Sequence, residues 1–288
     1  MDGIEEKNNI EESVNIEQLV PVYYAELLFD EIPKMEAKSF LKHLNRAFGD
    51  VSIKEDSSKY LVFSLDGLVK KHQELEPIPQ IVVVKNYSEL DRNRLEMALS
   101  QTWDWNEKED AVETSKYKIT ICDFLSENLD RQDRIDIFNK AMKVFIENLD
   151  CLAIHWINSL KMVSPETYIS AISSGDTADY LYGALNVRLF IVDQENGEFL
   201  MDTMGLACLG LPDLQCKFKG LNPEEVAGIL INYGYYIFEK GDVIKDGHTI
   251  QGLDEEQKWK CEHQNAIALP QRIVLDLNPG DEFAGTKE

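Results

Sequence analysis

The chain has 288 residues, 44% of them hydrophobic and 28% charged, which is ordinary for a globular protein and enough for a sizeable core. Its 52 acidic and 29 basic residues give a formal net charge of −23. This charge excludes nucleic acid and anionic membranes from the predicted partners, because both would repel the protein. It permits electrostatic steering of a basic protein partner, although acidity also keeps a protein soluble without any partner.

The cysteines indicate a reducing compartment. Five of them, an odd number, are spread over the chain and lie mostly inside apolar runs, which is typical of buried free thiols rather than a disulfide framework. The first residues lack the pattern of a signal peptide, and no apolar run approaches the roughly 18 residues that a membrane helix needs. The sequence therefore predicts a cytoplasmic protein.

In chain order, the first third predicts a β-α-β-β arrangement. Residues 1–20 are acidic with little hydrophobic period and predict a flexible tail. An aromatic strand at 22–29 is followed by a helix at 35–48 with apolar residues at helical spacing, and then by a hairpin of strands at 51–54 and 60–64. This order suggests half of a ferredoxin-like or related α+β sheet for the N-terminal lobe.

The middle of the chain repeats the alternation of strands and helices. β-branched and alternating apolar residues predict three strands, and apolar residues at a period of 3.6 predict two helices, the first capped by Ser88. A further helix begins at Ser164-Pro165, with serine as the N-cap and proline at the first helical position, and ends in a loop near 173–176. The predicted strands are 80–84, 117–124 and 151–157, and the predicted helices are 88–103 and 131–148.

The last third contains the best-defined local signals. Strands at 186–193 and 198–202 flank Asn196-Gly197, the dipeptide most typical of a tight hairpin. A helix begins at Asn222-Pro223 and ends at Gly241, and a second turn follows at Asp246-Gly247. The whole pattern predicts an α+β fold of mixed or antiparallel sheets with helices on one face. We expect a single unit of two intimately packed lobes, at about 21–150 and 151–288.

Several segments resemble a known family. They include GALNVRLF at 183–190, MDTMGL at 201–206, GLPDLQ at 210–215, DGHTIQG at 246–252 and VLDLNPGD at 274–281. These segments are similar to the bacterial family catalogued as domain of unknown function 4261. The resemblance implies a bacterial, intracellular setting and brings no activity, cofactor or catalytic residue.

Candidate functional residues remain after turn and cap positions are assigned. Glycine spacing at 205–210 mimics a phosphate loop, but Leu211-Pro212 stands where lysine and serine or threonine are required. Cys261 and His263, two apart on a strand, would share a face and could hold a metal, with His248 or His155 as further ligands. The polar residues without a predicted structural role form the candidate functional surface: Asp202, Asp213, Gln215, His248 and Gln251.

Two functional hypotheses follow. The first is a non-catalytic acidic binding protein without a cofactor, one form of which is an immunity protein that neutralises a basic partner in interbacterial competition. The alternative is a hydrolase or metal-dependent enzyme, in which Asp202, Asp213, Asp246 and His248 would converge for acid–base catalysis. Aspartates in turns commonly bond their own backbone, which favours the first hypothesis.

Overall fold

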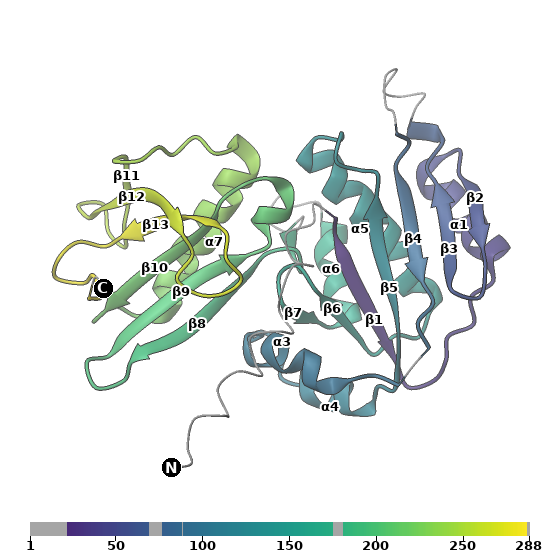
Figure 1. Ribbon diagram of the computed structural model, residues 1–288, viewed down its shortest axis with the longest axis horizontal. Helices are drawn as coiled ribbons and strands as arrows, with labels where there is room; N and C mark the ends of the chain where they lie inside the picture. Colours follow the sequence, from purple (N-terminus) through teal and green to yellow (C-terminus); the bar gives the residue numbers. More distant parts are fainter. Residues whose placement is uncertain (1–21, 69–76, 88, 175–180, 287–288) are drawn as a thin grey trace, which may run out of the picture. The chain divides into compact units, whose positions relative to one another are not determined.

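The computed structural model describes residues 22–68, 77–87, 89–174 and 181–286, which fall into two compact units (Figure 1). The first unit is Val22–Asn186, and the second begins at Val187. Each is built around one sheet, and the protein is α+β as predicted. The predicted tail at 1–20, the capping Ser88 and the loop after Ser174 lie outside the described residues.

The first unit contains a seven-stranded antiparallel sheet in the order β2-β3-β4-β5-β1-β6-β7. In a ferredoxin-like sheet the first strand would pair with the third, whereas here β1 lies between β5 and β6. The ferredoxin-like prediction is therefore wrong, because β4 and β5 separate β3 from β1. The strands are β1 Tyr24–Phe29, β2 Ser52–Asp56, β3 Tyr60–Ser64, β4 Gln80–Val84, β5 Tyr117–Phe124, β6 Ala153–Trp156 and β7 Lys161–Val163.

Helices cover both faces of this sheet, not one face as predicted. On one face, Phe63 of β3 packs against Phe145 of α5, which stacks on Phe40 of α1. On the other face, Leu28 of β1 joins a buried cluster that includes Val112 of α4. Alternation along a strand buries both faces of β1 in this way. The helices are α1 Ala37–Phe48, η2 Arg92–Leu95, α3 Glu96–Ser100, α4 Lys108–Thr114, α5 Arg131–Asn148 and α6 Pro165–Ser174.

The boundary between the units lies after Asn186, some distance from the lobe boundary predicted near residue 150. The reason is strand pairing: β6 extends the first sheet, with Trp156 opposite Ala25 of β1. Trp156 is fully buried and its ring contacts Phe138 of α5 and Tyr168 of α6. The segment from β6 to α6 therefore belongs to the core of the first unit.

The second unit has a six-stranded sheet in the order β11-β12-β13-β10-β9-β8. Among the paired strands that the structure describes in this sheet, β10 and β13 are parallel and the other pairs are antiparallel. None of the described helices in either unit is long and apolar enough to span a membrane. The elements are β8 Asn186–Asp193, β9 Glu198–Met204, η4 Leu206–Leu209, β10 Asp213–Lys219, α7 Pro223–Lys240, β11 Thr249–Gln251, β12 Lys258–Asn265 and β13 Ile273–Asn278.

Helix α7 packs on β9 and β10 and forms as its sequence predicts. The side chain of Asn222 accepts a hydrogen bond from the backbone of Glu224, and Gly241 ends the helix with a positive φ of 82°. Val226 and Leu230 are fully buried one turn apart.

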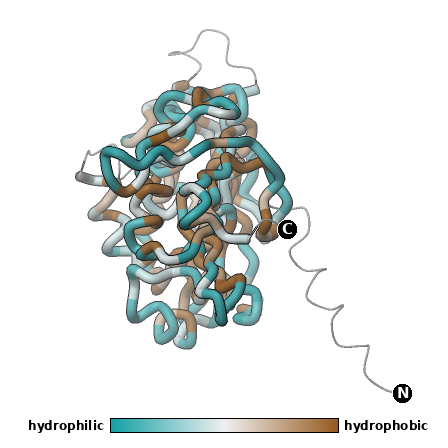
Figure 2. Tube along the Cα trace, turned by 90° about the vertical axis from the view of Figure 1, so that its left-hand side faces the viewer, coloured by the Kyte–Doolittle hydropathy of each residue, from teal (hydrophilic) through white to brown (hydrophobic). Residues whose placement is uncertain are grey.

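Figure 2 shows hydrophobic residues concentrated in inner segments and hydrophilic residues in outer loops. Because α7 covers one face of this sheet, the other face is available for a site.

Candidate functional site

Asp202 and Asp213, two of the predicted surface residues, are fully buried in a charged network. Asp202 accepts from Nε and Nη2 of Arg188, at 2.8 and 2.5 Å, and from Nη2 of Arg272 at 2.8 Å. Nε of Arg272 lies 3.1 Å from Oδ2 of Asp213, and Oγ1 of Thr203 donates to Asp213 Oδ1. Burial raises the pKa of Asp213, and the charge of Arg272 offsets only part of this effect. These aspartates are therefore structural anchors rather than a reactive surface.

The network holds the loop between β12 and β13. Arg188 donates to the carbonyl of Leu269 at 2.9 Å, and Arg272 donates to the carbonyls of Ala268 and Pro270. The oxygen of the Gln215 side chain accepts from the backbone of Ile267 at 3.0 Å. The loop is thus fixed by buried side chains of β8, β10 and its own end, and it forms one rim of a hollow on the sheet.

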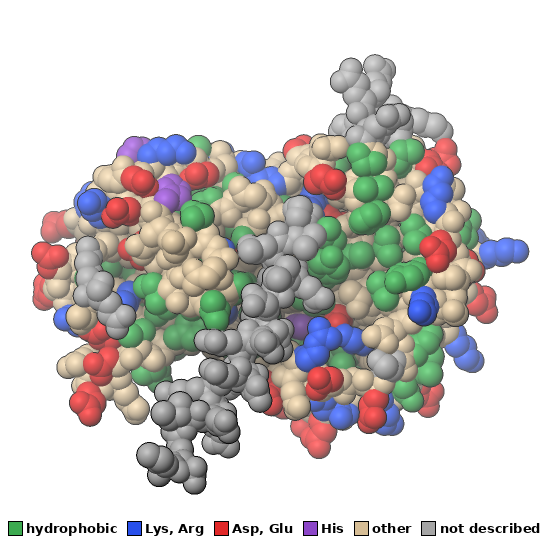
Figure 3. All heavy atoms as spheres, viewed as in Figure 1, with side chains coloured by type: hydrophobic (Ala, Val, Ile, Leu, Met, Phe, Trp, Pro, Cys, Tyr) green, Lys and Arg blue, Asp and Glu red, His purple; other side chains and the backbone are tan. Residues whose placement is uncertain are grey.

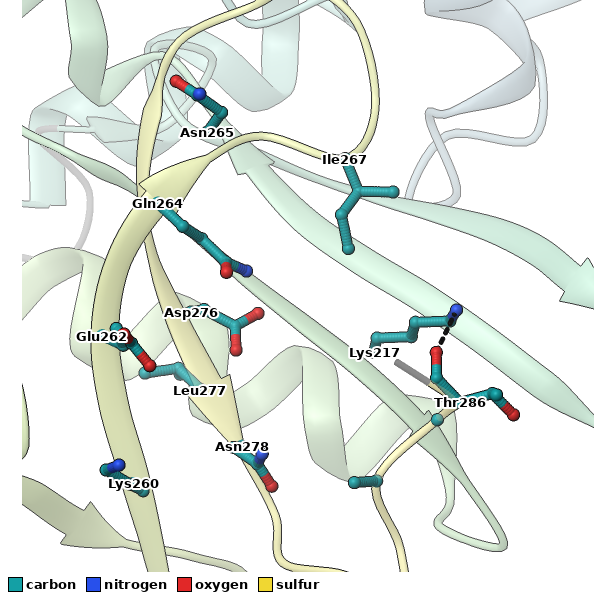
Figure 4. A pocket seen from close by; sticks show the side chains of 12 residues that line it. Lys217, Lys260, Glu262, Gln264, Asn265, Ile267, Asp276, Leu277, Asn278 and Thr286 are labelled. Carbon is teal, nitrogen blue, oxygen red and sulfur yellow. Dashed lines mark hydrogen bonds between the residues drawn. The ribbon is translucent and has the colours of Figure 1, made fainter. Parts of the chain in front are cut away.

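The hollow lies on the open face of the sheet and has a volume of about 350 Å³ (Figure 4). Alternation along β12 buries Trp259 and Cys261 on the α7 side and leaves Lys260 and Glu262 exposed on the other. Figure 4 shows Glu262, Gln264 and Asp276 on one side of the hollow and Lys217 and Thr286 on the other. The site is therefore a polar, mixed-charge depression rather than an apolar ligand pocket.

Two carboxylates face each other across neighbouring strands of the hollow. Glu262 of β12 lies directly opposite Asp276 of β13. Like charges in directly opposite positions repel each other, and the pair concentrates negative charge on this part of the hollow. Nε2 of the buried Gln215 side chain donates to Oδ1 of Asp276 at 3.0 Å and holds that carboxylate in place. Of the five residues predicted to form the functional surface, Gln215 contributes to the hollow, through its hydrogen bond to Asp276.

The hollow opens where two parallel strands separate. Strand β10 pairs with β13 only from Asp213 to Gln215. Beyond that point, Lys219 donates its backbone N–H to the carbonyl of Phe283, and Gly285 donates to the carbonyl of Lys217. The hollow therefore lies where residues 283–285 replace β13 as the neighbour of β10.

His248 and Gln251, the other predicted surface residues, lie at the far edge of the sheet. Both are exposed, in β11 or the turn before it, and β12 and β13 separate β11 from β10. His248 accepts through Nδ1 from the backbone of Lys245, and the backbone of Gln251 bonds with the hydroxyl of Tyr233. The structure does not bring His248 together with Asp202 and Asp213, so the predicted carboxylate–histidine cluster is not formed.

Cys261 and His263 share a face of β12 as predicted, but their contacts are with other groups. Burial raises the pKa of Cys261 to about 11. His263 lies between two aspartates, with Nδ1 2.7 Å from Asp246 and Nε2 3.1 Å from Asp242, and its backbone N–H and ring lower the pKa of Asp246. In the described part of the chain, no group of three or more potential metal-ligating side chains could hold a metal ion.

His155, the further ligand considered for a metal, belongs to a buried cluster in the first unit. Its Nδ1 lies 3.0 Å from Oε2 of Glu26, whose other oxygen pairs with Lys118. His155 and Glu26 are about 5% and 4% exposed. Burial alone would raise the pKa of Glu26, but the hydrogen bond and charge of His155 and the charge of Lys118 lower it to about 2. The cluster holds β1, β5 and β6 together from one side of the sheet.

The depressed pKa of Glu26 predicts a defined loss of stability in acid. A group with a lowered folded pKa stabilises the protein above its unfolded pKa of 4.5 and loses this contribution as the pH falls toward 2. We expect the wild type to lose about 2 kcal/mol more of its free energy of unfolding than Glu26→Gln between pH 5 and pH 3. Urea unfolding followed by tryptophan fluorescence at both pH values measures this, and equal losses in the two proteins would contradict the role assigned to Glu26.

The fold and the hollow define an α+β protein with a polar depression in its second unit. Residues 202–278 match a family model described as Domain of unknown function (DUF4261), which confirms the family resemblance for this segment. The matched segment contains Glu262 and Asp276 together with Gln215. No curated protein and no solved structure matches the chain.

Proposed function

We propose that this protein is a non-catalytic binding protein that recognises a basic segment of a partner protein at the hollow of the second unit. The observation that carries the proposal is the pair of carboxylates, Glu262 and Asp276, opposite each other in the hollow. An arginine or lysine side chain between them would form a charge-assisted hydrogen bond with each carboxylate.

The charge of the whole protein supports the same partner. The net charge is −23, and acidic side chains are visible on both units in Figure 3. Such a field raises the rate at which a basic partner arrives, while the hollow would supply the specific contacts. The proposal includes a bacterial cytoplasmic setting. The five free cysteines support the reducing compartment, and the bacterial origin is part of the proposal alone. One form of the proposal is that this protein is an immunity protein and that its basic partner is a toxin.

The proposal is tested with a peptide of alternating threonine and arginine, seven residues long, acetylated and amidated, and carrying a fluorophore. We expect fluorescence anisotropy to detect binding, and the double variant Glu262→Gln/Asp276→Asn to weaken it at least tenfold. The asparagine can still accept from Gln215, so the change removes charge without removing that hydrogen bond.

The matched control is Glu255→Gln/Glu256→Gln, which changes the net charge by the same amount on an exposed loop. We expect this control to change peptide affinity less than twofold, because screening weakens interactions beyond about 10 Å at 0.1 M salt. Equal weakening by both double variants would mean that only the overall charge matters, and the hollow would then not be the site. Absence of binding to the wild type would refute the proposal outright.

A further inference from the structure

The C-terminal strap, which we define as Phe283–Thr286, pairs with β10 where β13 has left it. Ala284 forms an antiparallel bridge with Phe218. The backbone N–H of Lys219 donates to Phe283 at 2.8 Å, and that of Gly285 donates to Lys217 at 3.1 Å. The strap therefore occupies the position of a short strand on this edge of β10, beside the hollow (Figure 4).

The end of the strap is attached by polar contacts. Thr286 donates to Oε1 of Glu198 through its backbone N–H, at 3.1 Å, and through its hydroxyl, at 2.5 Å. Nζ of Lys217 donates to the carbonyl of Thr286 at 2.7 Å. The hydrogen bonds from Thr286 lower the pKa of Glu198, so this carboxylate is charged at neutral pH. A short polar attachment of this kind can be replaced by another segment that offers the same backbone groups and a positive charge.

Backbone pairing is the chemistry that this edge of β10 recognises. The strap contributes small side chains at Ala284 and Gly285, so its pairing depends on main-chain groups rather than on a side-chain pocket. Strand addition gives a partner affinity through main-chain hydrogen bonds, and alternate side chains supply specificity. Side chains two residues apart on an added strand would point to the same face, about 7 Å from one another.

We propose that the basic partner binds as an extended strand along β10 in place of the C-terminal strap. Its alternate arginine or lysine side chains enter the hollow and contact Glu262 and Asp276, while Glu198, released from Thr286, pairs with a further basic residue. The strap is thus an internal competitor that occupies the strand position when the partner is absent. This inference rests on the proposed function and adds the conformation in which the partner is recognised.

A reversible disulfide tests the displacement of the strap. Because Ala284 lies opposite Phe218, the antiparallel register places Phe283 opposite Lys219, within reach of a disulfide. In Lys219→Cys/Phe283→Cys, we expect oxidation to weaken binding of the threonine–arginine peptide at least tenfold and dithiothreitol to restore it to within twofold of the reduced variant. The single variant Lys219→Cys controls for the lost charge and should show no response to oxidant.

A second test leaves the protein unchanged. The same peptide, N-methylated at the backbone nitrogen of each arginine, keeps every charge but cannot donate the hydrogen bond to β10 that Gly285 of the strap donates to the carbonyl of Lys217. We expect it to bind at least tenfold more weakly than the unmodified peptide. If the methylated peptide and the oxidised variant both bind normally while Glu262→Gln/Asp276→Asn does not, strand addition is wrong and the proposed function stands. If no form of the protein binds either peptide, both are wrong.

Discussion

Replacement of Asp202 by alanine is expected to destabilise the second unit by about 3–5 kcal/mol, which is a large part of the stability of an ordinary domain. The carboxylate receives hydrogen bonds from two arginines, and all three side chains are at least nine-tenths buried. Its removal leaves Arg188 without a carboxylate partner and Arg272 with Asp213 alone. Burying a charge without compensation is among the largest destabilising effects of a single substitution.

Urea unfolding of Asp202→Ala can be followed by tryptophan fluorescence, to which Trp259, the only tryptophan after residue 186 in the sequence, contributes the signal of the second unit. The matched control is Asp281→Ala, which removes an exposed aspartate from the same unit and should change the free energy of unfolding by less than 0.5 kcal/mol, the usual size of a surface effect. A loss of under 1 kcal/mol for Asp202→Ala would show that the network contributes little, and that the loop from 266 to 272 is held by other contacts.

Local signals were sufficient for many of the elements. The cap at Asn222, the proline that follows it and the stripe of apolar residues predicted α7 because all of these act within one or two helical turns. β4 and β5 were predicted with the bounds that the structure has, since β-branched residues and alternation mark them directly. The sequence did not predict α4 or β7, which are short and have weak periodicity.

Strand order required information that is not local. Nothing in the sequence of β1 indicates that it pairs with β5 and β6 rather than with β3, because pairing depends on contacts about a hundred residues apart. Burial of both faces of β1 was visible in the sequence, because residues 25–29 are all apolar except Glu26. This run could have predicted helices on both sides of the sheet. Glu26 interrupted that signal because its partners, His155 and Lys118, lie on other strands.

The candidate site shows the same limit. Asp202 and Asp213 stood out because no turn or cap explained them, but their partners lie up to 70 residues away and make them structural. Glu262 and Asp276 were missed, although a signal existed for each. Alternation along β12 places Glu262 on a face of polar residues, and Asp276 is the one charged residue within the apolar strand at 273–278. A polar residue inside an apolar strand indicates either a buried partner or a surface site.

Gly183→Ala is expected to destabilise the first unit by about 2–5 kcal/mol, through two effects that add. Its φ of +89° is unfavourable for a side chain, which costs about 1–2 kcal/mol. A Cβ at this position would lie 2.3 Å from Nε1 of Trp156. Trp156 cannot move aside easily, because it is fully buried against Tyr23, Phe138 and Tyr168. Overpacking of a rigid core costs a further 1–3 kcal/mol.

Gly49→Ala separates these effects within the same unit. Gly49 has a φ of +91°, close to that of Gly183, but a Cβ there would meet nothing within 4 Å. We therefore expect Gly49→Ala to lose about 1–2 kcal/mol, the cost of the backbone conformation alone, in urea unfolding followed by far-UV circular dichroism. The difference between the two variants measures the clash with Trp156. Equal losses would mean that the indole has room to shift, and that residues 181–186 are anchored to the first unit less tightly than the burial of Trp156 implies.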